Sequence, residues 1–171
     1  MIGEESKKEK LRRSVNKELI SLLNMHGEAT ALIARYRHNV SKKPGQDPFL
    51  FGHVLQILPE ELHGHGPGIG YAEEAFYTAL TLFAFAKNHG DGNIADAISR
   101  IAQNDGVLQR FRLAETSDNM DELRSRMRGI VSLIASKGES FNYVEFAVEL
   151  YNWQFDSASQ IRSWERRLSK R

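Results

Sequence analysis

Hydrophobic residues form an uninterrupted, uncharged segment from Ala75 to Ala86. The segment contains neither proline nor glycine, and its apolar residues recur at the spacings of three and four that are typical of a helix. It is too short to span a bilayer, which requires about 20 apolar residues. Because a helix that is apolar on nearly all sides has to be buried in a soluble protein, we expect a central helix over about residues 71–88 that the rest of the chain surrounds.

The apolar pattern before this segment predicts three further helices, over about residues 5–25, 29–36 and 48–58. The inward stripe of the first helix is expected to consist of Leu11, Val15, Leu19, Leu22 and Leu23. Asp47 followed by Pro48 is a helix-start signal, since aspartate caps the first turn and proline fits the first helical position. Pro59 is expected to end that third helix.

After the central segment, five more helices are predicted, over residues 94–101, 107–114, 120–137, 143–155 and from about 158 onward. Asn93 is expected to cap the first of them, and Ser117 or Asp118 the third, which Gly138 ends. No segment alternates apolar and polar residues over the length of a strand. The predicted fold is therefore all-α, a compact bundle of about nine helices in a single domain over residues 1–171, with two small helical lobes as the alternative.

The predicted helix 143–155 has two adjacent apolar stripes instead of one. The first stripe contains Tyr143, Phe146, Leu150 and Trp153, and the second contains Val144, Val148, Tyr151 and Phe155. Two stripes cannot easily face a single core, so one of them could meet another subunit. The alternative is that this helix lies deep inside the bundle.

The chain contains no cysteine, so disulfides and thiolate chemistry are excluded, and a reducing cytosol is the simplest location. The first residues, MIGEESKKEKLRRS, are charged and lack an apolar signal-peptide core. We therefore expect a cytoplasmic protein without a membrane anchor.

Charge is distributed unevenly, although the net charge of the whole chain is only +1. Residues 1–18 and 19–43 carry net charges of +2 and +3, residues 44–99 carry −6, and residues 100–171 carry +2. A nearly neutral protein with this distribution can present a local basic surface to nucleic acid. The alternative for each basic cluster is an ordinary solvated helix face.

Basic residues occur at several places where they could contact phosphates. The candidates are Arg35, Arg37, Lys42 and Lys43 before a predicted loop, Arg100, Arg110 and Arg112 in the middle of the chain, Arg124 and Arg128 in helix 120–137, and Arg162 and Arg166 near the end. Arg124 and Arg128 border an apolar stripe and could instead pack their stems on the core. Trp153 and Trp164 could stack on bases, but both lie on apolar stripes, which favours the core or an interface.

Histidines crowd only in the segment HGHGPGIG, residues 63–70. His63 and His65 could bind a metal, but without cysteine or a placed carboxylate nearby a flexible glycine-rich connection is the more natural interpretation. A metal nuclease that uses these residues with His53, His89 and Asp91 is the competing enzyme hypothesis. The chain contains no HExxH, GxSxG or phosphate-loop motif, so we expect neither a catalytic site nor a metal or other cofactor.

Several segments in order resemble the CasB-type small subunit of Cascade, the type I-E CRISPR surveillance complex. They are ARYRHNV (34–40), PFLFGHVLQILP (48–59), YAEEAFYTALTLFAFAKN (71–88), VLQRFRLAETSDNMDELRSRMRGIVSLIASKG (107–138) and FNYVEFAVELYNWQ (141–154). The resemblance covers about residues 29–167, and residues 1–28 look like an extension. None of these segments is a catalytic signature, so the resemblance depends on their combined order.

The resemblance implies a non-catalytic helical protein, present as two copies beside the large subunit and the repeated backbone subunit. It also implies contact with the guide RNA (crRNA) or the target DNA through basic residues, which stabilises the unwound target. The matching positions are Arg35, Arg37, Arg100, Arg110, Arg112, Arg124 and Arg128. Lys42, Lys43 and Arg126 match no position of the family pattern. A structural adaptor that joins proteins without touching nucleic acid is the alternative function.

Overall fold

A computed structural model describes residues 2–24, 28–103 and 106–170, and these residues form nine α-helices and one short 3-10 helix, η1. The elements are α1 (Ile2–Leu23), α2 (Glu28–His38), α3 (Pro48–Ile57), η1 (Glu60–Leu62), α4 (Tyr71–Ala86), α5 (Ile94–Ile101), α6 (Val107–Glu115), α7 (Met120–Ser136), α8 (Tyr143–Phe155) and α9 (Ser157–Leu168). Within the described residues there is no strand, only one isolated bridge between His89 and Phe141. The prediction of an all-α fold is confirmed.

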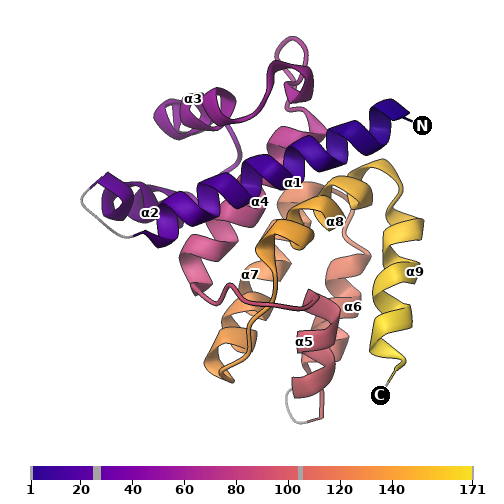
Figure 1. The fold of residues 1–171 in the computed structure, drawn as a ribbon. Helices are drawn as coiled ribbons and strands as arrows, with labels where there is room; N and C mark the ends of the chain where they lie inside the picture. The colour runs from indigo at the N-terminus through magenta and orange to yellow at the C-terminus, as the bar shows by residue number, and fades with distance from the viewer. Residues whose placement is uncertain (1, 25–27, 104–105, 171) are drawn as a thin grey trace.

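Helix α4 lies at the centre of the bundle, as its uninterrupted apolar sequence predicts. From Ala72 to Ala84 every residue except Glu74 is buried. Helices α8, α2, α7, α1 and α3 all pack against α4 (Figure 1). Helices α1 and α9, which carry many of the charged residues, lie outside this core.

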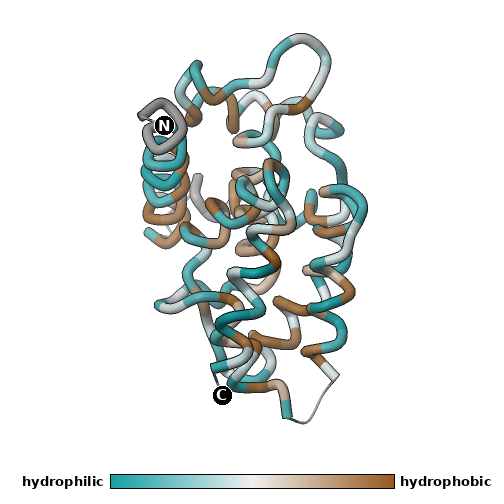
Figure 2. The backbone as a smooth tube through the Cα atoms, turned by 90° about the vertical axis from the view of Figure 1, so that its right-hand side faces the viewer, coloured by the Kyte–Doolittle hydropathy of each residue, from teal (hydrophilic) through white to brown (hydrophobic). Residues whose placement is uncertain are grey.

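Helix α1 crosses the front of the bundle in Figure 1 and packs against α8, α2 and α4. Its turns alternate between hydrophilic and hydrophobic colouring in Figure 2, as expected for an amphipathic helix. Leu11, Val15, Leu19 and Leu22 are buried as predicted, but Leu23 is 51% exposed and does not belong to the inward stripe. The predicted end of this helix at Met25 lies outside the described residues.

Local signals located several helix ends correctly. Asp47 accepts hydrogen bonds from the backbone N–H groups of Phe49 and Leu50 at 3.1 and 3.3 Å, and Asn93 caps α5 through the N–H of Ala95. Gly138 has a φ of +75° just after α7, as a helix-ending glycine should. The predicted cap of α7 was wrong, because Asn119, not Ser117 or Asp118, accepts the N–H of Glu122.

Helix α8 buries most of both of its apolar stripes within the chain itself. Tyr143, Phe146 and Leu150 are fully buried, and Val144 and Val148 of the second stripe are also buried. This is possible because α8 is sandwiched between α4, α1 and α9. The second stripe leaves apolar surface only at its C-terminal end, where Tyr151 is half-buried and Phe155 is 64% exposed, so the interpretation as a deep helix fits the rest of α8.

Candidate nucleic-acid interface

The structure does not bring the predicted basic residues together on one face. It separates them into two surface groups, one isolated residue and one buried residue. The first group, here called the loop surface, consists of Arg35 and Arg37 from the last turn of α2, Lys42 and Lys43 from the α2–α3 connection, and Arg128 of α7. The second group, the α6/α9 surface, consists of Arg110, Arg112, Arg162 and Arg166.

Tyr77 of the central helix α4 anchors the connection between α2 and α3. The single proton of the buried Tyr77 hydroxyl is shared between the backbone carbonyls of Asn39 and Lys42, whose oxygens lie 2.9 and 2.8 Å from the hydroxyl oxygen. Burial raises the pKa of Tyr77 to about 12, so the hydroxyl stays protonated and able to donate. The Asn39 side chain donates to Asp47 at 3.0 Å and thereby ties the two ends of the connection together. The basic residues of the loop surface are therefore carried by a fixed backbone.

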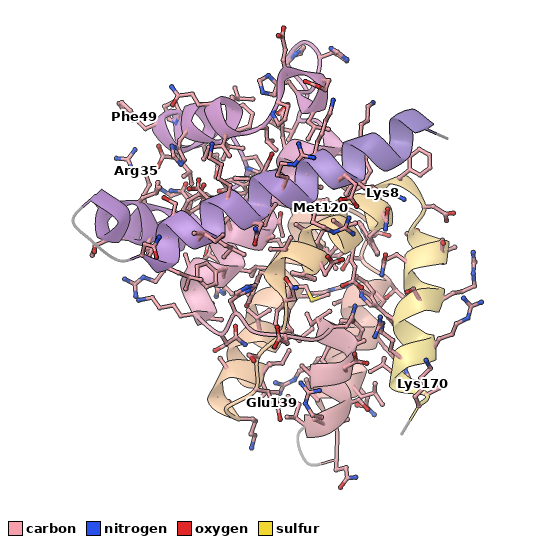
Figure 3. All side chains as sticks on the ribbon, in the orientation of Figure 1. Lys8, Arg35, Phe49, Met120, Glu139 and Lys170 are labelled. Carbon is pink, nitrogen blue, oxygen red and sulfur yellow. The ribbon has the colours of Figure 1, made fainter. Side chains whose placement is uncertain are left out.

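Arg35 and Arg128 each lie over an exposed aromatic ring. The Arg35 guanidinium is 5.2 Å from the centre of the Phe49 ring and 3.4 Å from Asp47 (Figure 3). The Arg128 guanidinium is 5.9 Å from the centre of the Phe85 ring. Both distances are within the range of cation–π contacts, so these two arginines are oriented without losing access to solvent.

The loop is attached to α7 by side chains that surround a small polar depression of about 180 Å³. Arg128 donates a hydrogen bond to the Ser41 hydroxyl, and the Lys43 ammonium lies 3.4 Å from the Asp121 carboxylate. Such exposed ion pairs contribute little to stability and exchange readily with other anions. Arg37 lies in the last turn of α2, is exposed, and has no ion pair in the described part of the chain. The loop surface therefore keeps a net positive charge.

Arg124 does not belong to either surface, which corrects its prediction as a phosphate contact. The residue is only 3% exposed, and its guanidinium donates to Glu74 and Thr78 of α4, both at 3.2 Å, and to Asp121. It also lies 5.4 Å from the centre of the Tyr77 ring. These contacts occupy the guanidinium, so Arg124 joins α7 to α4 and cannot reach a nucleic-acid backbone in this structure.

The α6/α9 surface lies on the opposite side of the bundle from α2, near Lys170 in Figure 3. Arg112 is neutralised by Glu165, to which it donates two hydrogen bonds at 3.1 and 3.0 Å. Arg110, Arg162 and Arg166 are exposed, and no ion pair involves them within the described ranges. Arg100 is separate from both groups at the end of α5, where its guanidinium donates to Glu139 at 2.8 Å.

His53, His63 and His89 each make a hydrogen bond within the fold. His53 bonds to the buried Glu18 at 2.7 Å, His63 bonds to the carbonyls that end α3, and His89 accepts the backbone N–H of Tyr143. Among the residues that the structure describes, no three potential metal ligands come together, and no helix is long and apolar enough to cross a membrane.

The two tryptophans that could stack on bases are both buried, and their indole N–H groups have partners inside the chain. Trp153 donates to the carbonyl of Glu115 at 3.2 Å, and Trp164 donates to the carboxylate of Glu149. Sequence reasoning missed Phe49 and Phe85, the two exposed rings of the loop surface. The sequence pattern indicates that Phe49 is exposed, because it does not belong to the series Leu50, Val54, Leu58 that faces the core.

The model of the CRISPR-associated protein Cse2 family matches residues 32–169. The chain belongs to the Cse2 family. This match confirms the resemblance to the CasB-type small subunit of type I-E Cascade that the sequence indicated. A comparison with curated protein sequences found no match.

Solved structures of Cse2 and CasB proteins share the fold of this Cse2-family chain. CasB from Thermus thermophilus is 21% identical, with a TM-score of 0.75 over 96% of this chain and 98% of the other. A second structure, of a Cse2-family protein from the same species, gives 21% identity and a TM-score of 0.74 with the same coverage. CasB from Thermobifida fusca is 20% identical, with a TM-score of 0.68 over 94% and 96% of the two chains. The likeness extends over nearly the whole chain, including most of α1.

Proposed function

We propose that this Cse2-family chain is a non-catalytic small subunit of an RNA-guided complex and that its loop surface stabilises the unwound target DNA. The observation that carries this proposal is the loop surface itself, in which Tyr77 and Asp47 hold the α2–α3 segment and Ser41 bonds to Arg128 of the distant helix α7. Phosphates bind to such a surface without first having to order it, so little binding energy is lost to conformational entropy.

Unwinding of a guided target exchanges a DNA duplex for an RNA–DNA duplex of similar stability, as is known for a single-protein effector. Modest contacts to a sugar–phosphate backbone can therefore determine how long the DNA stays open. Each phosphate contact to a single strand contributes a salt slope of about −0.7 through counterion release. The exposed, weakly paired cations of the loop surface are suited to this role. The proposed partners are the large subunit, the repeated backbone subunit, a second copy of this chain and the guide RNA, and membership of the Cse2 family supports them.

The α6/α9 surface is proposed as a secondary contact. Arg110, Arg162 and Arg166 have no acidic partner within the described ranges, which leaves their charge available, but no cation–aromatic pair of the described residues orients them as such pairs orient Arg35 and Arg128. In a pair of copies, this surface of one copy could continue the path that begins at the loop surface of the other. A cytoplasmic location is consistent with this role and stays a prediction.

The proposal can be tested by adding the subunit to a guide-loaded complex that lacks it. The test variant carries Lys42→Ala and Lys43→Ala, and the matched control carries Arg13→Ala and Lys17→Ala, two exposed charges on the outer face of α1. We expect the test variant to assemble normally but to hold target DNA more weakly, with a salt slope smaller by about 0.7 per lost contact.

The control variant should retain DNA like the wild type. Normal assembly and unchanged DNA retention in the test variant would contradict the proposal and favour the structural adaptor. If neither variant assembles into the complex, the support for a DNA contact is likewise lost. The replaced lysine and arginine side chains would then be needed for binding to protein partners.

A further inference from the structure

We propose that the loop surface binds single-stranded nucleic acid through its bases as well as its phosphates, with Phe49 and Phe85 as stacking platforms. This inference rests on the proposed function, and it specifies the ligand class as an unpaired strand. A duplex cannot use such platforms because its bases are already stacked and paired inside the helix.

Phe49 is the most exposed large hydrophobic residue in the described part of the chain, at 77%. It lies in the first turn of α3, beside the buried Leu50, so its ring points away from the core. Arg35 covers part of the ring and is itself held by Asp47, which also caps α3. An aromatic ring and a guanidinium plane together offer the two kinds of surface on which bases stack.

Phe85 forms the second platform, in the last turn of α4. Its side chain is 36% exposed, and Arg128 lies over the ring while donating a hydrogen bond to Ser41. The described residues contain three cation–aromatic pairs, and the third, Arg124 with Tyr77, lies buried under the same loop. All three pairs therefore converge on the connection between α2 and α3.

The loop carries basic residues in the segment that links the two cation–aromatic pairs. It is joined to the Arg35–Phe49 pair through Asp47 and to the Arg128–Phe85 pair through Ser41. Asp47 follows Ser41 by only six positions, so these two anchor points are at most about 22 Å apart. Lys42 and Lys43 lie within this interval. A short unpaired strand can reach both rings while its phosphates pass the lysines, which is the arrangement of basic and aromatic groups that single-strand binders use.

A protein partner is the other possible occupant of these rings, and the composition of the surface disfavours it. Lysine is depleted in the centre of protein interfaces, whereas here Lys42 and Lys43 lie in the loop segment between the two anchor residues Ser41 and Asp47. Phe155 provides a contrast, because its side chain is 64% exposed at the end of α8 but no cation lies over its ring among the described residues. It is therefore a matched control for exposure without the arginine partner.

The test compares binding of the full chain to an oligothymidylate and to an abasic oligomer with the same number of phosphates. Wild type is expected to bind the oligothymidylate about a hundredfold more tightly, since each of the two stacked bases contributes about 1.4 kcal/mol. Phe49→Ala should lose about tenfold on the oligothymidylate and nothing on the abasic oligomer. Phe49→Tyr should retain the difference because it keeps the ring, and Phe155→Ala should behave like wild type.

The possible failures are distinguishable. Equal affinity of wild type for the two oligomers would overturn base stacking while leaving phosphate binding intact. An absence of binding to either oligomer would overturn both this inference and the proposed nucleic-acid contact. If Phe49→Ala binds both oligomers like wild type but no longer enters the guide-loaded complex, Phe49 contacts a protein partner and the stacking assignment is wrong.

Discussion

Replacement of Arg124 with alanine is expected to destabilise the fold rather than to remove a contact with nucleic acid. The guanidinium is nearly inaccessible and is the cation opposite Glu74, whose side chain is only 14% exposed. Removal of one partner of a buried ion pair costs about 3–5 kcal/mol, because the remaining charge is left without compensation. In a domain of this size, 1 kcal/mol lowers Tm by about 2–4 °C, so we expect a decrease of roughly 6–20 °C.

The assay is thermal and urea unfolding of the purified chain, with Arg128→Ala as the matched control. Arg128 lies one turn further along α7 but is exposed, so its replacement should change stability by no more than about 0.5 kcal/mol. Adding Glu74→Gln to Arg124→Ala should restore part of the loss, because the uncompensated carboxylate is then absent.

The pH dependence of the Arg124→Ala variant provides an independent check. Burial already raises the pKa of Glu74, and loss of the cation should raise it further. The stability that a raised carboxyl pKa contributes is present below the unfolded pKa and is lost as pH rises through the folded pKa. The deficit of the variant should therefore shrink in acid. An unfolding midpoint equal to that of wild type, together with weakened DNA binding, would refute this reasoning and place Arg124 on the surface.

Three further predictions concern other parts of the structure. Tyr77→Phe removes the hydroxyl that bonds to two loop carbonyls, so it should cost about 1–3 kcal/mol in urea unfolding and weaken DNA binding; unchanged values of both would contradict the anchoring role. Burial raises the pKa of Glu149 to about 7, because its effect exceeds that of the N–H donors that lower the pKa. The stability of the wild type should therefore fall as pH rises from about 4.5 through 7. Glu149→Gln should remove this dependence when unfolding midpoints are compared across that range. Gly64→Ala should lower Tm because the added Cβ would lie 2.6 Å from the backbone nitrogen of Gly70. Gly68→Ala should leave Tm unchanged because no atom lies closer than 4.0 Å to its added Cβ. Equal Tm values for the two variants would contradict the close contact between Gly64 and Gly70.

The sequence was sufficient to predict the elements of the fold because their causes are local. The central helix follows from a run of apolar residues that contains no charge, and the starts of α3 and α5 follow from Asp47 and Asn93. The cap of α7 was misassigned because Ser117, Asp118 and Asn119 are consecutive and all suit that role. The choice between them depends on where α6 ends and how α7 packs, which is a tertiary property.

The candidate site was only partly predictable because its grouping depends on tertiary contacts. Arg124 and Arg128 are equivalent in the sequence pattern, one turn apart beside an apolar stripe. The structure distinguishes them, since Glu74 and Thr78 lie opposite Arg124 only after α4 has packed on α7. In the same way, the periodicity of α3 indicates that Phe49 faces outward, but it cannot reveal that an arginine from the preceding helix lies over the ring.

The most direct test of the central claim is the lifetime of the opened target DNA on a guide-loaded complex. The lifetime is measured without this subunit, with the wild-type chain, and with the chain that carries Lys42→Ala and Lys43→Ala. We predict that the wild-type chain lengthens the lifetime, that added salt reduces the gain, and that the variant gives little of it despite stable incorporation. An equal lifetime with and without the incorporated wild-type chain would contradict the proposal that this subunit holds the DNA open.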